Sequence, residues 1–353
     1  MLELMPEVYL VTLFGLLGGV VLGLAARLSR FCTLGAIEDA LYGQDYTLVR
    51  MWGVAIGIAI SVVHLAALSG LVILPESVYR SVPFTPLMTI FGGLVFGTGM
   101  AFSGNCGFGA LSRLGGGDLR SFVIILVMGV TAYAVSSGLF SNITLWLRDV
   151  LTLDDTTPGL LDAVSHVVNI DVSLLGIVAG LTIFVFSLSE SSFLNRLKYP
   201  FWGSAVGLAI ASGWIGTHWI AQVGFEGIQP VSHSFTAPIG STILYVMTSS
   251  GNGLSFAIGS VAGVWLGAVM GSLIKGHFRL EACEDPRELQ RQIVGAMMMG
   301  LGASFAFGCS VGQGLSAMSV LSVNAPLTVI SILIGARMGL AYLISGRFLF
   351  LNR

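Results

Sequence analysis

The sequence predicts an all-α integral membrane protein with about nine transmembrane helices and short re-entrant helices. Three observations support this prediction: composition, long apolar stretches and internal repeats. Of the 353 residues, 55% are hydrophobic and only 10% are charged, and the mean hydropathy is +0.89. Soluble globular chains are roughly one quarter charged, so the composition excludes a soluble enzyme. The net charge of -2 provides no basic excess to attract nucleic acid.

The apolar stretches have the length of membrane-spanning helices, which need about 17 to 25 residues to cross the hydrocarbon core. The stretches that reach or approach this length are 8–29, 49–74, 86–103, 121–147, 172–189, 201–220, 254–275, 292–308 and 327–350. They lack the two-residue alternation of β-barrel strands. Because Glu3 and Glu7 precede the first stretch without any basic residue, we expect it to be mature structure, not a signal peptide.

The basic residues predict the orientation. If the nine stretches cross in alternation, Arg80 and Arg148 fall in connections on one side and Arg337 falls within the last stretch. The other Lys and Arg residues all fall in connections on the opposite side or at the ends of the stretches that face it. Cytoplasmic connections are enriched in Lys and Arg, so we expect the N-terminus outside and the C-terminus in the cytoplasm.

Internal repeats are the most informative feature of the chain. Gly-rich apolar segments end at Cys32, Cys106 and Cys309. When the cysteines are superposed, these positions align: Gly18 with Gly92, Gly92 with Gly295, Gly97 with Gly300, Gly99 with Gly302, Gly35 with Gly109, and Gly109 with Gly312. A weaker fourth copy has Gly216 where the cysteine would stand. Chance seldom produces such agreement, so we interpret these segments as copies of one unit.

The repeats predict two membrane halves. Residues 1–171 hold two Cys-containing repeats, 172–200 form a connecting span and loop, and 201–353 hold one repeat without and one repeat with a cysteine. The single connecting span would invert the second half, as in many transporters that bind substrate near the midplane. We expect a short re-entrant helix after each cysteine, because irregular backbone at this depth must line a cavity or be buried in protein. The three cysteines should converge at the centre.

The expected site suits an anion. Free N–H groups at the starts of short helices stabilise negative charge, and a neutral thiol is a weak donor suited to the terminal sulfur of an anion such as thiosulfate. The candidate substrate-binding residues are Cys32, Cys106, Cys309, Asn105, Gly107, Gly109, Ser310, Gly312 and Gln313. Two alternatives stay open here: the glycines pack helices together, and the polar side chains satisfy the backbone of broken helices.

Arg337 is an ionisable residue within a span, which is a functional hypothesis by default. It would attract the anion, pair with carbonyl groups of a broken helix or extend to the membrane edge. For His64 and His218, which also lie within spans, we favour core hydrogen bonds. The chain contains no CxxC pair and no P-loop, so we expect no metal, no cofactor and no ATP hydrolysis. Cys283, in a charged loop, is interpreted as an ordinary thiol.

Four segments carry a family resemblance: RFCTLGA around Cys32, SGNCGFGALSRLGGG around Cys106, the loop FRLEACEDPRE and FGCSVGQGLSA around Cys309. They resemble the YeeE/YedE sulfur-transport proteins of bacterial inner membranes. The resemblance implies nine spanning helices around an hourglass-like constriction. It also implies uptake of thiosulfate, or a related reduced-sulfur anion, through transient S–H contacts at Cys32, Cys106 and Cys309. A cytoplasmic sulfur-accepting protein would be a partner.

Three other functions remain open at this point. The family has members linked to selenium or other reduced sulfur compounds, so the substrate would be a selenium compound or polysulfide. A membrane thiol-disulfide oxidoreductase would cycle two of the converging cysteines through a disulfide. A channel for a neutral solute such as hydrogen sulfide or water would need no anion site. A transporter that performs no chemical reaction is the reading we favour.

Overall fold

The computed structural model describes residues 6–153, 160–162, 165, 170–225, 227–249, 251, 253–282 and 285–346, and its regular elements there are helices. The α-helices are α1 (Glu7–Ser29), α2 (Thr33–Glu38), α3 (Thr47–Leu68), α4 (Pro86–Ser103), α5 (Gly107–Leu114), α6 (Leu119–Ser136), α7 (Ser141–Leu151), α9 (Val172–Ser187), α10 (Ser191–Leu194), α11 (Lys198–Val223), α12 (Thr236–Met247), α13 (Phe256–Ile274), α14 (Pro286–Phe305) and α15 (Asn324–Ser345). Two π-helical segments, η1 (Asp39–Gly43) and η3 (Gly312–Ala317), and the 3₁₀ turn η2 (Leu74–Glu76) complete the set.

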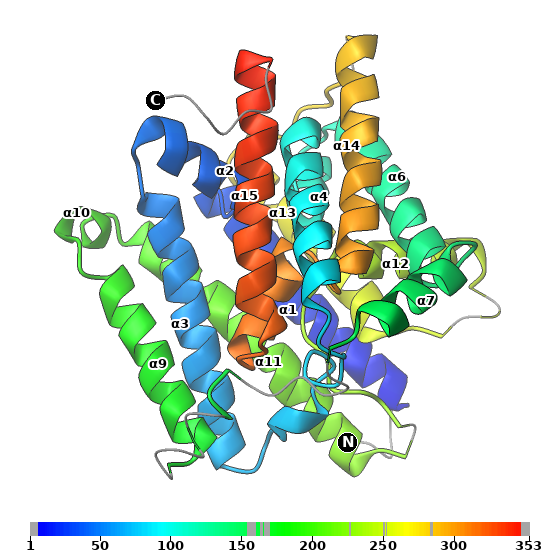
Figure 1. Cartoon of the computed structure of the whole chain (residues 1–353). Helices are drawn as coiled ribbons and strands as arrows, with labels where there is room; N and C mark the ends of the chain where they lie inside the picture. The colour runs from blue at the N-terminus through cyan, green and yellow to red at the C-terminus, as the bar shows by residue number, and fades with distance from the viewer. Residues whose placement is uncertain are drawn as a thin grey trace.

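These elements confirm the all-α membrane class. Within the described residues, each of the nine apolar stretches coincides with a helix at least 16 residues long, the shortest being α9. In the part of the chain that the structure describes, six helical segments are long and apolar enough to cross a membrane: Glu7–Gly43, Thr47–Leu68, Pro86–Leu114, Leu119–Ser136, Phe256–Ile274 and Asn324–Ser345. The helices α9 and α12 are shorter apolar helices. In Figure 1, α1 starts near one end of the molecule and α15 finishes at the other.

Two elements differ from the expected spans. The stretch 121–147 contains two helices, because α6 ends at Ser136 and α7 starts at Ser141. A Gly138 β-carbon would lie 2.8 Å from the Ala134 α-carbon, so the turn between the helices has no room for a side chain there. The helix α12 was not expected, since its twelve residues are too few for a full span.

The long helices contact one another in matched pairs. The helix α1 packs on α13 and α11, and α3 packs on α11 and α9. The helix α4 packs on α15 and α14, and α14 also packs on α6. Figure 1 shows α15, α4 and α14 side by side, with α3 and α9 at one edge of the bundle.

Glycines allow the close approach of α4 and α14. A β-carbon added at Gly99 would lie 2.6 Å from the carbonyl oxygen of Gly295, and one at Gly295 would lie 2.6 Å from that of Gly99. Gly92 and Gly302 face each other in the same way, at 2.7 and 2.6 Å. Small residues let helix backbones approach within a membrane, where dispersion contacts replace the hydrophobic effect as the driving force. The repeated glycines therefore hold the middle of the bundle together.

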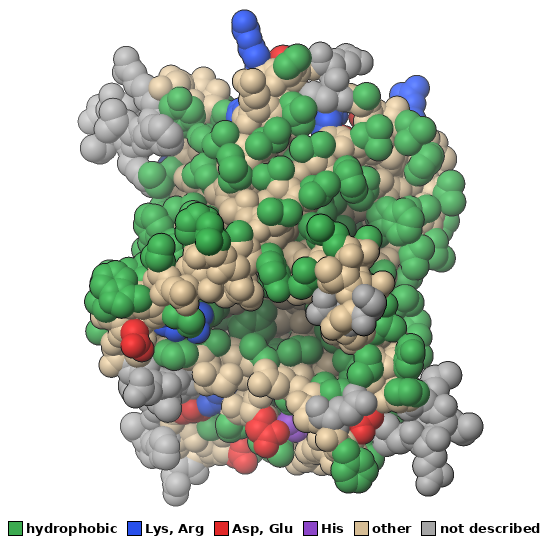
Figure 2. Space-filling model, turned by 90° about the vertical axis from the view of Figure 1, so that its right-hand side faces the viewer, with side chains coloured by type: hydrophobic (Ala, Val, Ile, Leu, Met, Phe, Trp, Pro, Cys, Tyr) green, Lys and Arg blue, Asp and Glu red, His purple; other side chains and the backbone are tan. Residues whose placement is uncertain are grey.

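The surface has the pattern of a protein embedded in lipid. Figure 2 shows hydrophobic side chains over the middle of one face, while most of the Asp, Glu, Lys and Arg side chains gather toward its two ends. Side chains that are large, hydrophobic and exposed include Leu174, Val178, Leu181 and Val185 on α9. This outward apolar face needs lipid contact, because exposed apolar surface in water is unfavourable.

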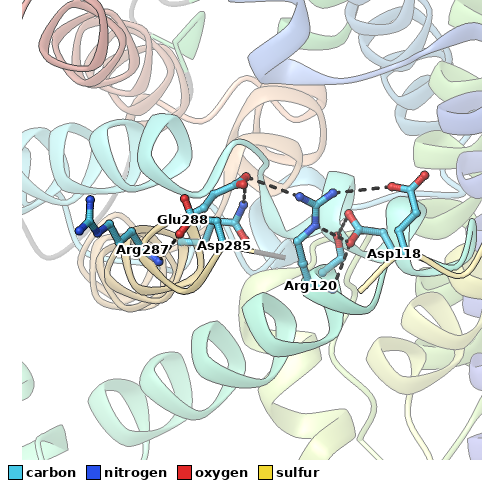
Figure 3. A network of polar contacts seen from close by, with 8 residues as sticks. Asp118, Arg120, Asp285, Arg287 and Glu288 are labelled. Carbon is cyan, nitrogen blue, oxygen red and sulfur yellow. Dashed lines mark hydrogen bonds and ion pairs between the residues drawn. The ribbon is translucent and has the colours of Figure 1, made fainter. Parts of the chain in front are cut away.

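Two loops at one end of the bundle are clamped together. The Leu119 N–H donates to the Glu281 carbonyl at 3.0 Å, and the Glu281 N–H donates to the Gly117 carbonyl at 3.1 Å. The Arg120 guanidinium contacts Asp118 at 3.2 Å, and Glu281 and Glu288 at 3.6 Å each. Figure 3 shows Arg120 reaching between Asp118 and the start of α14, where Glu288 lies. The clamp fixes the loop after α5 to the loop before α14.

Candidate functional site

Each of the three repeat cysteines lies where a long helix gives way to a short helical segment. Cys32 and Cys106 are the N-cap residues of α2 and α5, in extended backbone conformations. Cys309 follows the end of α14 and precedes helical residues that continue into η3. N-cap side chains accept hydrogen bonds from the first free N–H groups of a helix. The cysteines therefore occupy equivalent local positions in three separate parts of the chain.

Two of the three thiols make the same hydrogen bond. The Gly109 N–H donates to Cys106 Sγ at 3.4 Å, and the Gly312 N–H donates to Cys309 Sγ at 3.4 Å. Gly35 stands at the same place, three residues after Cys32, but the Cys32 side chain makes no cap hydrogen bond with the described residues of α2. In both bonds the donor is the glycine three residues after the cysteine. This bond occupies acceptor capacity of the sulfur and leaves its S–H group free to donate.

The structure brings the three cysteines into one region. The thiols of Cys32 and Cys106 lie within hydrogen-bonding range of each other, and Cys309 lies close enough to act electrostatically on Cys106. A β-carbon at Gly109 would lie 3.7 Å from both Cys32 Sγ and Cys106 Sγ. All three are unpaired as thiols, with Cys106 and Cys309 buried and Cys32 partly buried.

A row of aromatic rings lies in the same buried cluster as the thiols. Phe31 stacks on Trp52 with ring centroids 4.7 Å apart and meets Phe108 edge to face at 6.4 Å. Phe108 in turn contacts Phe235 at 5.1 Å. Phe31 and Phe108 are chain neighbours of the cysteines, and the three phenylalanines are buried. The rings exclude water and hold the ends of the short helices in place, which strengthens polar contacts made between them.

Hydroxyl groups surround Cys309. Ser234 Oγ lies 3.9 Å from Cys309 Sγ, and the Tyr79 hydroxyl is hydrogen-bonded to Ser234. Burial raises the pKa of the Tyr79 phenol, so the phenol stays protonated and keeps its donor. Sequence reasoning missed both residues, because each lies in an irregular loop outside the repeats. The only signal in the sequence was the run of small polar residues around Ser234.

The polar residues beside the cysteines have different roles. The Gln313 side-chain amide donates to the carbonyls of Ala306 and Phe307, at 2.9 and 3.0 Å, and so satisfies the broken end of α14. Asn105 is 2% exposed, and its Oδ1 has no hydrogen-bond partner among the described residues. Ser310 Oγ accepts a hydrogen bond from Thr33 Oγ1 at 3.0 Å. The Gln313 amide nitrogen thus serves the backbone, while the side-chain oxygens of Gln313 and Asn105 are both buried without a partner among the described residues.

Two of the three candidate glycines, Gly107 and Gly312, lie in close contact with neighbouring side chains. A β-carbon at Gly107 would lie 2.6 Å from Met128 Cε, and one at Gly312 would lie 2.8 Å from both Ser234 Oγ and the Tyr79 hydroxyl. At Gly109 the nearest atoms would be 3.7 Å away. Gly107 and Gly312 therefore permit close packing, and Gly109 and Gly312 also supply the N–H groups that reach sulfur.

A cavity of about 360 Å³, which we call the Arg148 cavity, leads toward Cys309. Its wall includes Tyr79, Arg148, Ser234, Phe307 and Gly308. The Arg148 guanidinium carbon lies 4.1 Å from the centre of the Phe307 ring, a cation–π contact. Arg148 Nε is buried without a hydrogen-bond partner, and no ion pair of Arg148 occurs within the described ranges. Figure 2, which draws the right-hand side of the view in Figure 1, shows a hollow with a basic side chain at its edge.

Arg148 is the functional candidate that the sequence did not single out. In the sequence it was only one of two basic residues assigned to the outer connections. Burial lowers the pKa of Arg148, and no acidic group raises it, yet arginine remains charged at physiological pH. An uncompensated cation in a cavity beside Cys309 is suited to drawing in an anion.

The remaining candidates lie away from the thiols or within the helix core. Arg337 is exposed on α15, at the edge of a separate cavity. His64 Nδ1 hydrogen-bonds to the Ile60 carbonyl at 3.0 Å, and His218 Nε2 accepts from the Ile73 N–H at 3.0 Å. Cys283 lies outside the described residues.

The fourth repeat copy departs from the expected alignment. Gly216, placed opposite the cysteines, lies inside the continuous helix α11, which runs on to Val223. There it permits contact with Phe14, since a β-carbon would lie 2.6 Å from that ring. The short helix that follows α11 is α12, whose N-cap is Phe235. Ser234 lies directly before this N-cap residue and contacts Cys309 from there.

These features define the class: a multi-pass helical membrane protein whose helix breaks bring thiols and N–H groups to one buried region. The chain belongs to the Sulphur transport family, whose sequence model matches residues 28–338. The family resemblance found in the sequence is thereby confirmed. The chain is 24% identical over 329 residues to "Thiosulfate transporter TsuA" of Spirochaeta thermophila, covering 91% of this chain and 96% of that protein. It is 22% identical over 338 residues to the Escherichia coli protein of the same name, covering 92% of each.

Proposed function

We propose that this protein transports thiosulfate across the membrane, with Cys32, Cys106 and Cys309 as successive contact points. The observation that carries the proposal is the thiol geometry, in which Cys106 and Cys309 each accept a glycine N–H and Cys32 lies within hydrogen-bonding range of Cys106. The names of the two relatives support thiosulfate as the substrate. The anion passes unchanged, so the protein needs no cofactor and performs no chemical conversion.

The thiols act as neutral donors. A thiolate would repel a dianion, whereas an S–H group donates weakly to the terminal sulfur of thiosulfate. Cys106 lies next to Cys32 and within electrostatic range of Cys309, so the anion exchanges one S–H contact for another over short steps. Asn105 supplies an additional polar group beside this path, since its Oδ1 is unpartnered in the orientation described and an amide presents either N–H or oxygen after a flip.

The Arg148 cavity is the entrance. Arg148 provides a positive charge that no described carboxylate neutralises, and Ser234 and the Tyr79 hydroxyl connect the cavity with Cys309. Arg113 at the end of α5 acts electrostatically on Cys32. Positive charges at both ends of the thiol row lower the barrier for an anion that enters a largely apolar interior.

Two inverted halves explain the arrangement. Superposing the repeats places Gly92 on Gly295 and Gly99 on Gly302, and the contacts join Gly99 with Gly295 and Gly92 with Gly302. Exchanging the two repeats converts the first of these contacts into the second. Such a relationship is expected from a two-fold axis, as in a symmetric dimer interface. The helix pairs agree, because exchanging the halves converts α1 with α13 into α11 with α3, and α4 with α15 into α14 with α6.

We place the protein in a bacterial inner membrane with its N-terminus outside, on the basis of the basic residues in the connections. Moving a dianion toward a negative interior costs about 2.3 kcal/mol per charge per 100 mV. Proton coupling or rapid consumption by a cytoplasmic sulfur-accepting protein would supply this energy.

The decisive experiment is uptake of radiolabelled thiosulfate by sulfur-starved cells, with growth on thiosulfate as a second readout. Cys32→Ser, Cys106→Ser and Cys309→Ser are compared with the wild type at matched membrane abundance. Each is expected to reduce uptake at least tenfold, because a hydroxyl oxygen replaces the soft sulfur contact. Normal uptake by all three variants would overturn the proposal.

The proximity of Cys32 and Cys106 also bears on the alternative of a thiol-disulfide oxidoreductase. Mass spectrometry without reductant, before and after substrate addition, distinguishes the two functions. A stoichiometric disulfide that turns over favours the oxidoreductase, and thiols that stay reduced during uptake favour the transporter. Competition by sulfate separates an anion site from a pore for neutral solutes, which excess sulfate would leave unaffected.

A further inference from the structure

A second cavity, of about 580 Å³, lies between α2, η1, α3 and α15, and we call it the Arg337 groove. Its wall consists mainly of apolar side chains, among them Ile37, Leu41, Val49, Ile56, Ile332 and Leu333. Several of these are open to the surroundings, with Val49 and Leu333 each 43% exposed. Since α3 and α15 are both candidate membrane spans, the groove faces lipid.

The groove has a polar floor and one charge at its edge. Thr33 and Ser310 lie in its wall, where their hydroxyl groups bond to each other. Arg337 is exposed, and no hydrogen bond or ion pair joins it to any of the residues that the structure describes. Arg337 precedes the end of α15 at Ser345 by about 12 Å of helix, at about 1.5 Å per residue. The long side chain can extend toward the interface while its stem packs on the groove wall.

We propose that the Arg337 groove binds one glycerophospholipid of the adjacent leaflet. The acyl chain lies along the apolar walls, and the phosphate accepts hydrogen bonds from the Arg337 guanidinium. The occupant is identified by complementarity: an apolar slot beside a single unpaired guanidinium fits a long apolar chain that ends in a phosphate. Arginine binds phosphate through two parallel N–H donors, so the contact is strong and oriented.

A lipid here would close the wall of the thiol region. The Thr33–Ser310 bond and the Trp52 ring form the part of the groove wall that lies next to the region around Cys32 and Cys309. An acyl chain over this bond keeps water and stray ions of the interface away from the thiols. The inference is independent of the transported substrate, because it concerns lipid retention and not uptake.

The test is native mass spectrometry of the full chain, purified in a mild detergent and titrated with dioleoylphosphatidylglycerol or with dioleoylglycerol, which has the same chains but no phosphate. The wild type is expected to bind one phospholipid at least tenfold more tightly than dioleoylglycerol. Arg337→Gln should weaken phospholipid binding at least tenfold and leave dioleoylglycerol unaffected. Ala40→Phe and Leu333→Trp fill the groove from opposite walls and should weaken both ligands.

Arg291→Gln removes an exposed charge elsewhere, and Val130→Phe enlarges an exposed residue on α6, so both controls should bind like the wild type. A cooperative thermal unfolding transition shows that a variant is folded. Two groove-filling variants are used so that the test survives if one of them does not fold. Equal phospholipid binding by Arg337→Gln and the wild type would overturn the proposal. The proposal would also be overturned if the wild type bound dioleoylglycerol as tightly as the phospholipid. Displacement of the bound lipid by millimolar thiosulfate, or a protein dimer that carries no lipid, would overturn it as well.

Discussion

Thr33 Oγ1 donates a hydrogen bond to Ser310 Oγ across 3.0 Å, although 277 positions separate these residues in the chain. Thr33 follows Cys32 and Ser310 follows Cys309, so this bond joins two of the three thiol-bearing turns. It also closes the inner wall of the Arg337 groove. One side-chain contact thus ties the site, the two repeats and the lipid-facing surface together.

Thr33→Val should weaken the contact between the two turns. Valine has nearly the shape of threonine but leaves the Ser310 hydroxyl without its donor, a loss of about 1 kcal/mol for a typical hydrogen bond. We expect a small decrease in thermal stability and slower thiosulfate uptake. The Thr33→Val/Ser310→Ala pair should lose no more than the larger single effect, which a double-mutant cycle measures. Fully additive losses would show that the bond carries no coupling.

Gly295→Ala should destabilise the α4–α14 contact. Its β-carbon would lie 2.6 Å from the Gly99 carbonyl oxygen, closer than packing allows, so the helices must separate. Overpacking of this kind costs about 1 to 3 kcal/mol, measured as a lower thermal unfolding midpoint in detergent. Gly43→Ala is the matched control, because no atom lies within 4 Å of a β-carbon there. An equal shift in both variants would contradict the packing argument.

Arg148→Gln should raise the KM for thiosulfate uptake about tenfold and change the maximal rate little. Loss of a binding charge that acts equally before and during translocation changes KM alone. Arg148→Lys should retain part of the effect, since the charge remains but the flat contact with Phe307 is lost. Uptake kinetics at several salt concentrations provide the measurement. An unchanged KM in Arg148→Gln would remove this cavity as the entrance.

Mild oxidation should join Cys32 to Cys106 before either joins Cys309. The first two thiols lie within hydrogen-bonding range, whereas Cys309 is placed beside Ser234. We expect diamide to abolish uptake and dithiothreitol to restore it, with the disulfide located by peptide mapping. Cys32→Ser should prevent this crosslink. A disulfide formed mainly through Cys309 would require a different order of the thiols.

Arg120→Met should loosen the clamp between the two loops. Arg120 contacts three acidic residues, but its side chain is 26% exposed, so we expect a stability loss of at most about 1 kcal/mol. The sensitive readout is protease cleavage within residues 277–282, which should increase several-fold. Arg287→Met, which removes an exposed charge nearby, should leave cleavage unchanged. Equal cleavage in both variants would show that backbone pairing alone holds the loops.

The cysteine copies were predictable because each leaves a local signature. Glycines at fixed spacing before Cys32, Cys106 and Cys309, and one glycine three residues after each, are visible in the chain without its fold. The long helices were predictable for a similar reason, since apolar length is a direct consequence of bilayer thickness. The break of the fourth span at Ser136 was not predictable from hydropathy, because apolar residues continue past it.

Ser234, Tyr79 and Arg148 lie in loops or in a short helix outside the repeats, and no local pattern marks them. They reach Cys309 only because segments distant in sequence fold against one another. Gly216 is a different case. Its alignment with the cysteines was misleading, because α11 continues through it without a break.

The sequence by itself therefore determined the membrane class, the positions of the long helices, the repeats and the identity of the three thiols. These follow from local composition and residue spacing, because apolar stretches are read directly as spans and residue spacing as helix periodicity. The tertiary structure alone decided which groups face the thiols, where the charges stand and which cavity meets lipid. Those relationships depend on contacts between distant segments, and no property of either segment alone encodes their distance.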